Sequence, residues 1–168
     1  PDNTKVAVIE FFDYQCVFCS RFAPELEKVM KAQPDVRYLF KEWPIFGGRW
    51  EASLQAAQQG LTVWQKKGPQ AYVTYHNAVY ATGHNEGKLT AEDILAAASK
   101  AGLAAPAPGD HTASLEKNSN LAEELGLTGT PGIIVMPVSG ATPDTITVFP
   151  EAVTADRLQV AIRKATAR

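Results

Sequence analysis

A change of hydrophobic period at Cys16 is the feature that most constrains the fold of this chain. Before it, residues 6–12 form a nearly continuous apolar run rich in β-branched and aromatic side chains, which predicts a buried strand. After it, apolar residues recur every three or four positions, which predicts an amphipathic helix. Residues 36–43 then alternate as a second strand. We therefore expect a right-handed βαβ unit with parallel strands.

The remainder of the chain predicts a helical block followed by a second strand-rich unit. Four segments combine helix-forming residues with a periodic apolar face: 51–64, 70–81, 90–101 and 111–125. Thr90, followed by Asp93, resembles a capping box at the start of the third segment. Residues 133–136 and 146–149 predict an antiparallel hairpin, and Thr154 is expected to cap a final helix.

Composition excludes several classes of function. The 168 residues carry 16 Lys and Arg against 18 Asp and Glu, so the net charge is −2 and no nucleic-acid partner is expected. Apolar runs fall short of the ~20 residues that span a bilayer, so the chain is not expected to be membrane-embedded. A chain of this length can bury a core without disulfides or structural metals. The two cysteines are therefore not needed for stability.

The cysteines, Cys16 and Cys19, form a C-x-x-C pair at the expected start of the first helix. Such spacing also occurs in zinc sites, but the chain has no third cysteine and its histidines lie far along the sequence, so no metal site is predicted. Residues three apart share a helix face, so the two thiols can form a disulfide. The helix N-terminus should lower the pKa of Cys16 and make it the nucleophile. Cys19, one turn deeper, should resolve the mixed disulfide.

Glu10 is a charged residue within the first apolar strand, six positions before Cys16. One interpretation is an edge-facing or salt-bridged carboxylate. The other is a buried acid with a raised pKa that helps to deprotonate Cys19. Lys41, on the neighbouring strand, is a candidate counter-ion for Glu10, and the alternative is a solvated lysine near the strand end.

Three motifs, in order along the chain, resemble the DsbA-like thiol–disulfide oxidoreductases of the thioredoxin superfamily, including their ScsC-like members. Residues 8–19 (VIEFFDYQCVFC) resemble the active-site segment of this family. Residues 41–47 (KEWPIFG) resemble its second strand and the following turn, and residues 126–132 (GLTGTPG) resemble its cis-proline loop. The resemblance covers essentially the whole chain.

The resemblance implies an α/β thioredoxin fold, β-α-β followed by β-β-α, with a helical subdomain inserted between the second and third strands. A single domain is expected over residues 1–168. Its thioredoxin core would comprise 1–48 and 126–168, and the inserted helices would occupy 49–125.

The resemblance also implies substrate contacts around the cysteines. Pro131 would lie beside the pair in a cis peptide bond as part of the catalytic site, whereas on its own it could be an ordinary turn proline. The backbone of Thr130 would pair with an extended substrate segment. Phe18 and Tyr14 flank the cysteines and are expected to form an apolar rim for unfolded substrate, although both residue types also occur in cores.

These features together predict a protein disulfide oxidoreductase that acts on cysteines of exported proteins and needs no cofactor beyond the Cys16–Cys19 disulfide. The resemblance implies unfolded or cysteine-containing exported substrates, a membrane redox partner and a periplasmic location. The direction of exchange, as oxidase, reductase or isomerase, stays open because Val17-Phe18 has neither the histidine of the strongest oxidase nor the proline of reducing thioredoxins.

Two further alternatives concern assembly and activity. The chain begins four or five residues before its first expected strand, so an oligomer is expected only if an N-terminal segment is missing from this chain. The alternative to an enzyme is a non-catalytic thioredoxin-fold chaperone or binding module with a structural disulfide. A disulfide that closes so short a loop adds little stability, which favours the redox interpretation.

Overall fold

The computed structural model describes residues 3–104 and 109–166. Its strands are β1 (Val6–Phe12), β2 (Arg37–Glu42), β3 (Gly132–Pro137) and β4 (Thr147–Phe149). Its helices are α1 (Val17–Ala32), α2 (Glu51–Lys67), α3 (Pro69–Ala81), α4 (Ala91–Lys100), α5 (Thr112–Glu124) and α6 (Ala155–Thr166). The parts of the expected domain that fall at 1–2, 105–108 and 167–168 lie outside the described residues. The order of elements confirms the predicted α/β architecture.

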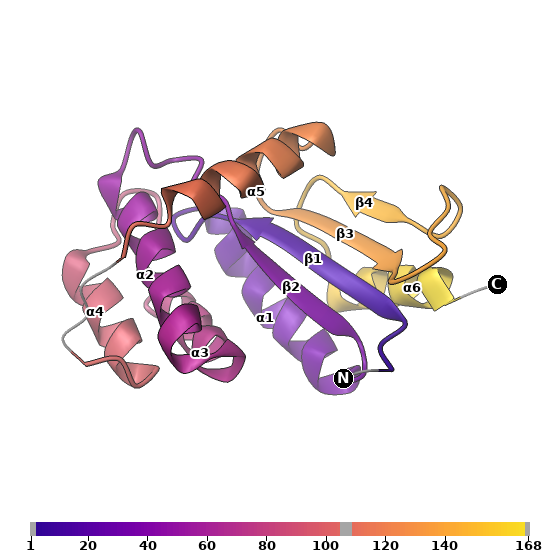
Figure 1. The fold of residues 1–168 in the computed structure, drawn as a ribbon, viewed down its shortest axis with the longest axis horizontal. Helices are drawn as coiled ribbons and strands as arrows, with labels where there is room; N and C mark the ends of the chain where they lie inside the picture. The colour runs from indigo at the N-terminus through magenta and orange to yellow at the C-terminus, as the bar shows by residue number, and fades with distance from the viewer. Residues whose placement is uncertain (1–2, 105–108, 167–168) are drawn as a thin grey trace.

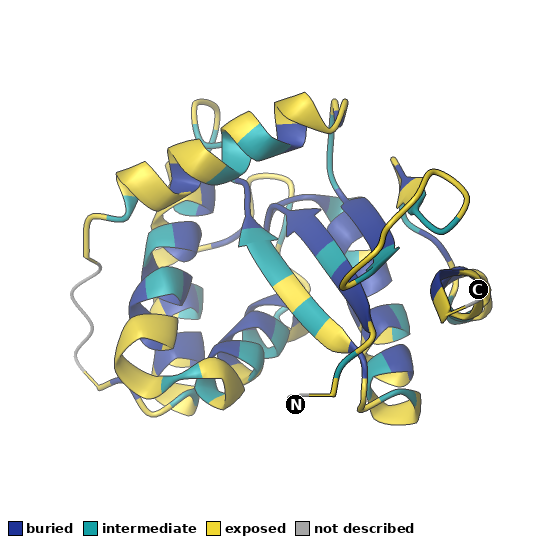
Figure 2. Ribbon diagram, turned by 45° about the vertical axis from the view of Figure 1, so that its right-hand side comes forward, coloured by how far each residue is buried: buried dark blue, intermediate teal, exposed yellow. Residues whose placement is uncertain are grey.

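A four-stranded sheet in the order β2-β1-β3-β4 forms the centre of the molecule (Figure 1). β1 pairs with β2 in parallel, which confirms the predicted βαβ unit. β3 pairs with β1 and with β4 in antiparallel fashion, which confirms the predicted hairpin. β1 is almost entirely buried, whereas β2 is a partly exposed edge strand (Figure 2). The segment that leads into Cys16 therefore starts from the interior of the sheet.

Helices cover both faces of this sheet, because side chains alternate between faces along each strand. The face that carries Val8 packs against α1 and α6, with a core that includes Leu26 and Leu158. The other face carries Phe11 and packs against Ala122 of α5. Although α5 lies within the stretch expected as inserted helices, its contacts therefore join it to the sheet (Figure 1).

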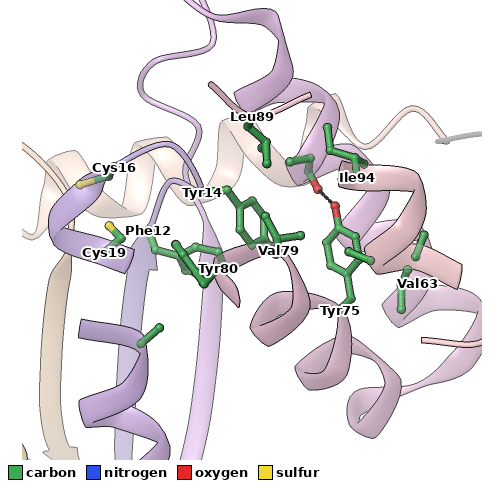
Figure 3. Close-up of a cluster of buried hydrophobic side chains, with 14 of the residues drawn as sticks. Phe12, Tyr14, Cys16, Cys19, Val63, Tyr75, Val79, Tyr80, Leu89 and Ile94 are labelled. Carbon is green, nitrogen blue, oxygen red and sulfur yellow. Dashed lines mark hydrogen bonds between the residues drawn. The ribbon is translucent and has the colours of Figure 1, made fainter. Parts of the chain in front are cut away.

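The helices α2, α3 and α4 pack against one another beside the sheet and form the rest of the helical block. Their shared core includes Val63, Tyr75 and Ile94, and the Tyr75 hydroxyl donates a hydrogen bond to the Ala56 carbonyl at 2.7 Å (Figure 3). At the start of α4, Thr90 forms the predicted capping box with Asp93. The same core continues through Phe12 and Tyr14 to the cysteines, so the helical block reaches the redox pair (Figure 3).

Candidate active site

Asp13 fixes the turn that connects β1 to α1. Its buried carboxylate accepts a hydrogen bond from the Gln15 N–H at 2.8 Å and another from the Phe46 N–H at 2.9 Å. Its carbonyl accepts the Cys16 N–H at 3.1 Å. One side chain therefore holds the turn before Cys16 and ties it to the connection between β2 and α2. An Asp directly after a strand commonly forms such a turn, so the sequence already contained the signal.

Replacing Asp13 with alanine is expected to destabilise the fold. The buried N–H of Gln15 and the partly buried N–H of Phe46 would lose their acceptor, which costs about 2–4 kcal/mol in the free energy of unfolding. Chemical denaturation of the purified variant measures this loss. Asp110→Ala is the matched control, because the exposed Asp110 carboxylate accepts the Thr112 N–H at 3.0 Å in a similar local turn. An equal loss in both variants would contradict the role of burial at Asp13.

The two cysteines lie at the start of α1, with Cys16 at the N-cap position as the change of period predicted. Both are free thiols, and Figure 3 shows their sulfur atoms on the same side of the helix. Cys16 is 3% exposed and Cys19 is fully buried at 0%. Cys16 is therefore the more accessible of the two, although its surroundings cover most of it.

The immediate surroundings push the pKa values of the two thiols in opposite directions. A hydrogen bond from Cys19 lowers the pKa of Cys16 to about 6, against the opposing effect of burial, and the backbone N–H groups of Phe18 and Cys19 lower it further. Burial raises the pKa of Cys19 well above its ordinary value, and its hydrogen bond to Cys16 adds to the rise. Near neutral pH, Cys16 is therefore a thiolate and Cys19 holds its proton.

Glu10 lies buried on β1, on the face of the sheet that packs against α1. Burial raises its pKa well above the ordinary value, and the charges of Cys16 and Glu42 raise it further. Within the described part of the chain, Glu10 Oε1 has no hydrogen-bond partner. The nearby charge of Glu10 also contributes to the raised pKa of Cys19. The arrangement matches the buried-acid interpretation of Glu10 and not the edge-facing or salt-bridged one.

The structure corrects the expectation that Lys41 is the counter-ion of Glu10. In the β1–β2 register Glu10 lies opposite Phe40, and Lys41 lies opposite Phe11. Since neighbouring residues of a strand point to opposite faces, the Glu10 carboxylate and the Lys41 ammonium lie on opposite faces of the sheet. Side chains alternate between the two faces along each strand, and the register places Lys41 one residue out of step with Glu10, so the two side chains do not meet.

The loop that leads into β3 brings Thr130 and Pro131 to the cysteines. The Cys16 thiol donates a hydrogen bond to the Thr130 carbonyl at 3.3 Å, across 114 residues of sequence. The Thr130–Pro131 peptide bond is cis, as the resemblance implied. Pro131 is buried and Thr130 is half-buried. The loop therefore forms one wall of the site next to Cys16.

Phe18 and Tyr14, the two aromatic residues expected at the rim, have different environments. Phe18 is 53% exposed and lies beside the cysteines, where it could contact a substrate. Tyr14 is only 1% exposed and belongs to the core, so the expectation that it contacts substrate is wrong. Its hydroxyl donates a hydrogen bond to Glu42, which accounts for its burial.

A third buried carboxylate, that of Glu42, was not predicted from the sequence. Its Oε2 accepts hydrogen bonds from the Tyr14 hydroxyl at 2.7 Å and from the Tyr72 hydroxyl at 2.6 Å. Burial raises its pKa to about 8, although the two hydroxyl groups partly offset that rise. Gly60 of α2 packs so closely that a Cβ there would lie 2.7 Å from Glu42 Oε2. The signal in the sequence was its position two residues after Phe40, which places Glu42 on the same face as Glu10.

Within residues 3–104 and 109–166, no group of three or more His, Cys, Asp or Glu side chains could hold a metal ion. No helix there is long and apolar enough to cross a membrane.

Comparison with known proteins identifies relatives over almost the full chain. BcfH from Salmonella enterica Typhimurium is 39% identical, with a TM-score of 0.84, and the match covers 99% of this chain and 72% of BcfH. The catalytic domain of Proteus mirabilis ScsC is 27% identical, with a TM-score of 0.82, over 100% of this chain and 87% of that domain. A periplasmic thioredoxin-like protein from Salmonella enterica serovar Typhimurium is 29% identical, with a TM-score of 0.78, over 98% of this chain and 86% of that protein.

A comparison with curated protein sequences gave no significant match. The DSBA-like thioredoxin domain family, in contrast, matches residues 7–163. That match includes the cysteine pair and all four strands except Val6, the first residue of β1, and it agrees with the fold and with the placement of the cis-proline loop. The chain therefore belongs to the family of DSBA-like thioredoxin domains.

Proposed function

We propose that this chain is a thiol–disulfide oxidoreductase whose redox pair is Cys16 and Cys19. The observation that carries the proposal is the contrast between the two thiols, with the pKa of Cys16 lowered to about 6 and that of Cys19 raised by burial. A purely structural disulfide needs no such contrast in pKa. Thiol–disulfide exchange, in contrast, needs one thiolate that attacks and a second thiol that stays protonated until it resolves the mixed disulfide. Membership of the DSBA-like family supports the same activity.

The chemistry can run through the residues of the site in balanced steps. In the reducing direction, the Cys16 thiolate attacks one sulfur of a substrate disulfide, and the other substrate sulfur leaves as a thiolate. Formation of this mixed disulfide removes the Cys16 charge, one of the causes that raise the pKa of Glu10, so Glu10 can ionise and accept the proton of Cys19. Cys19 then attacks the Cys16 sulfur, which releases the first substrate sulfur. Two electrons pass to the substrate, and the Cys16–Cys19 disulfide forms. Oxidation of a substrate dithiol is the same sequence in reverse.

Substrate would dock on the surface next to Cys16. The carbonyl of Thr130, which accepts a hydrogen bond from Cys16 when that thiol is protonated, would accept one from an extended substrate strand instead, and Pro131 next to it has no N–H to compete. The exposed Phe18 ring offers an apolar contact for unfolded chain segments. Contacts of this kind tolerate varied sequences, which suits a range of cysteine-containing exported proteins. A periplasmic location and a membrane redox partner would complete the cycle, and the related Salmonella protein is itself described as periplasmic.

Capture of a reaction intermediate tests the proposed roles of the cysteines. Cys19→Ser removes the resolving thiol and keeps the Cys16 thiolate, so the variant should accumulate a mixed disulfide with a scrambled, disulfide-bonded substrate protein. Non-reducing electrophoresis and intact mass measure the adduct. The wild-type protein should resolve it and release substrate. If Cys19→Ser forms no adduct while it remains folded, Cys16 does not attack disulfides and the proposed function is wrong.

The direction of exchange follows from two assays of the wild-type protein. Rapid oxidation of a reduced substrate by the disulfide form would identify an oxidase. Recovery of correct pairing in a scrambled substrate by the dithiol form would identify an isomerase. Native mass spectrometry of the same samples establishes whether the active species is a monomer or an oligomer.

A further inference from the structure

The connection between α3 and α4 is hydrogen-bonded to the segment that carries Cys16. The Glu86 N–H donates to the Gln15 carbonyl at 2.9 Å. The N–H groups of Gly87 and Leu89 both donate to Gln15 Oε1, at 2.8 Å and 3.2 Å. Gln15 is fully buried and directly precedes Cys16. The inserted helices are therefore fixed to the active-site turn through three main-chain N–H groups, which donate to the carbonyl and the side-chain oxygen of Gln15.

Glu86 adds a contact that brings charge to the same place. Its Oε1 accepts a hydrogen bond from the Val17 N–H at 3.0 Å. Val17 is the first residue of α1, so its N–H is one of the donors that a helix N-terminus leaves without an intrahelical partner. That end of the helix also stabilises a thiolate at Cys16. The Glu86 carboxylate therefore binds the Val17 N–H, which would otherwise be available to the Cys16 thiolate. It also places a negative charge at the helix end where the thiolate charge develops.

The backbone shows that the position of Glu86 is built into the fold. Glu86 has a φ of +54°, in the left-handed region that non-glycine residues seldom adopt. Gly87 follows with a φ of +94°, and a Cβ there would lie 2.8 Å from Nε1 of Trp50. Close packing against Trp50 and hydrogen bonds to Gln15 therefore fix the backbone conformation of this loop. Such strained residues persist where their surroundings determine them, and they cluster at functional sites.

The other titratable and charged groups around the start of α1 come from β1, from α1 and from the turn between them, where the pKa of the buried Asp13 carboxylate is raised by burial and in small part by the charge of Glu86. Cys19 lies on α1 and donates its hydrogen bond to Cys16, and Glu10 lies buried on β1. Arg21, further along α1, places its guanidinium 5.6 Å from the centroid of the Phe18 ring. Glu86 differs from Glu10 because it is exposed, so salt can screen its charge.

We propose that Glu86 is a positioning residue that sets the reduction potential of the Cys16–Cys19 pair. Its carboxylate repels the Cys16 thiolate and takes up an N–H that would otherwise stabilise it. The reduced dithiol form is therefore less stable, and the disulfide is a weaker oxidant, than the helix N-terminus alone would make it. This inference rests on the proposed function. Within that function, Glu86 is the residue of the helical insertion that biases the direction of exchange.

The variant Glu86→Gln tests this inference because it keeps an acceptor oxygen for the Val17 N–H and removes the charge. The equilibrium of the pair with reduced and oxidised glutathione should shift toward the dithiol form by about two- to fivefold at low ionic strength. The pH at which Cys16 is alkylated at half its maximal rate should fall. Both differences from wild type should disappear near 1 M salt, where the Debye length is about 3 Å.

Glu27→Gln is the matched control, because it removes the same charge from an exposed residue about 15 Å further along α1. Its ion pair with Lys31 is also exposed, so the variant should keep the wild-type equilibrium. If Glu86→Gln matches Glu27→Gln, or if its shift persists in 1 M salt, the charge of Glu86 does not set the potential and the inference is wrong. If wild type does not equilibrate with glutathione at all, the proposed function fails instead.

Discussion

Replacement of Cys16 by serine is expected to lower the rate of thiol–disulfide exchange by about a thousandfold or more. The serine hydroxyl has almost the same volume but stays protonated at neutral pH, so the attacking anion is lost. Cys19 cannot take over, because it is fully buried and its pKa lies well above the ordinary value. The same variant should form no mixed disulfide with substrate, in contrast to Cys19→Ser.

Reduction of a disulfide-bonded substrate protein, followed by the release of its thiols, measures this loss. Ser20→Ala is the control, since it removes a hydroxyl from the next residue after Cys19 on the same helix and should retain wild-type activity. Circular dichroism should show the wild-type fold in both variants. Exchange by Cys16→Ser at more than about a tenth of the wild-type rate would mean that another group is the nucleophile.

Local sequence patterns were sufficient to predict the elements that hold the cysteines. The change of period at Cys16 predicted both the strand before it and the helix after it, because a buried strand and an amphipathic helix leave different apolar spacings. The capping box at Thr90 and the Thr154 cap of α6 were likewise visible within four residues. The inward stripe of α6, which includes Leu158 and Ile162, followed the helical period.

Contacts between distant segments account for what the sequence did not reveal. Tyr14 follows a strand and flanks the cysteines in sequence, which is why it was expected at the rim. Its hydroxyl instead donates a hydrogen bond to Glu42, 28 positions later, which the local sequence does not reveal. The contact between Glu86 and Val17 spans 69 positions and follows no local pattern. The separation of Glu10 and Lys41 depended on the register of two strands, which neither strand specifies on its own.

The burial of the Glu42 carboxyl predicts that the fold loses stability as pH rises. Burial raises the pKa of Glu42 in the folded protein to about 8, well above the value of about 4.3 expected in an unfolded chain. The stability that the protonated carboxyl contributes is therefore fully present below about pH 4.3 and is lost as pH rises through about 8. At about 1.4 kcal/mol per pH unit, the loss from this group approaches about 5 kcal/mol by pH 9.

Glu42→Gln should remove most of this pH dependence, because the amide oxygen still accepts the hydroxyl groups of Tyr14 and Tyr72 and carries no charge at any pH. The free energy of unfolding of the disulfide form, measured at pH 5 and pH 9, tests the prediction without the titration of the thiols. Wild type should lose several kcal/mol more than the variant between these pH values. Glu10, also buried with a raised pKa, should add its own decline with rising pH to wild type and to Glu42→Gln alike. Glu116→Gln on the exposed surface of α5 should behave as wild type. An equal decline in wild type and Glu42→Gln would show that Glu42 is already ionised in the fold at neutral pH, stabilised by the two hydroxyl groups despite its burial.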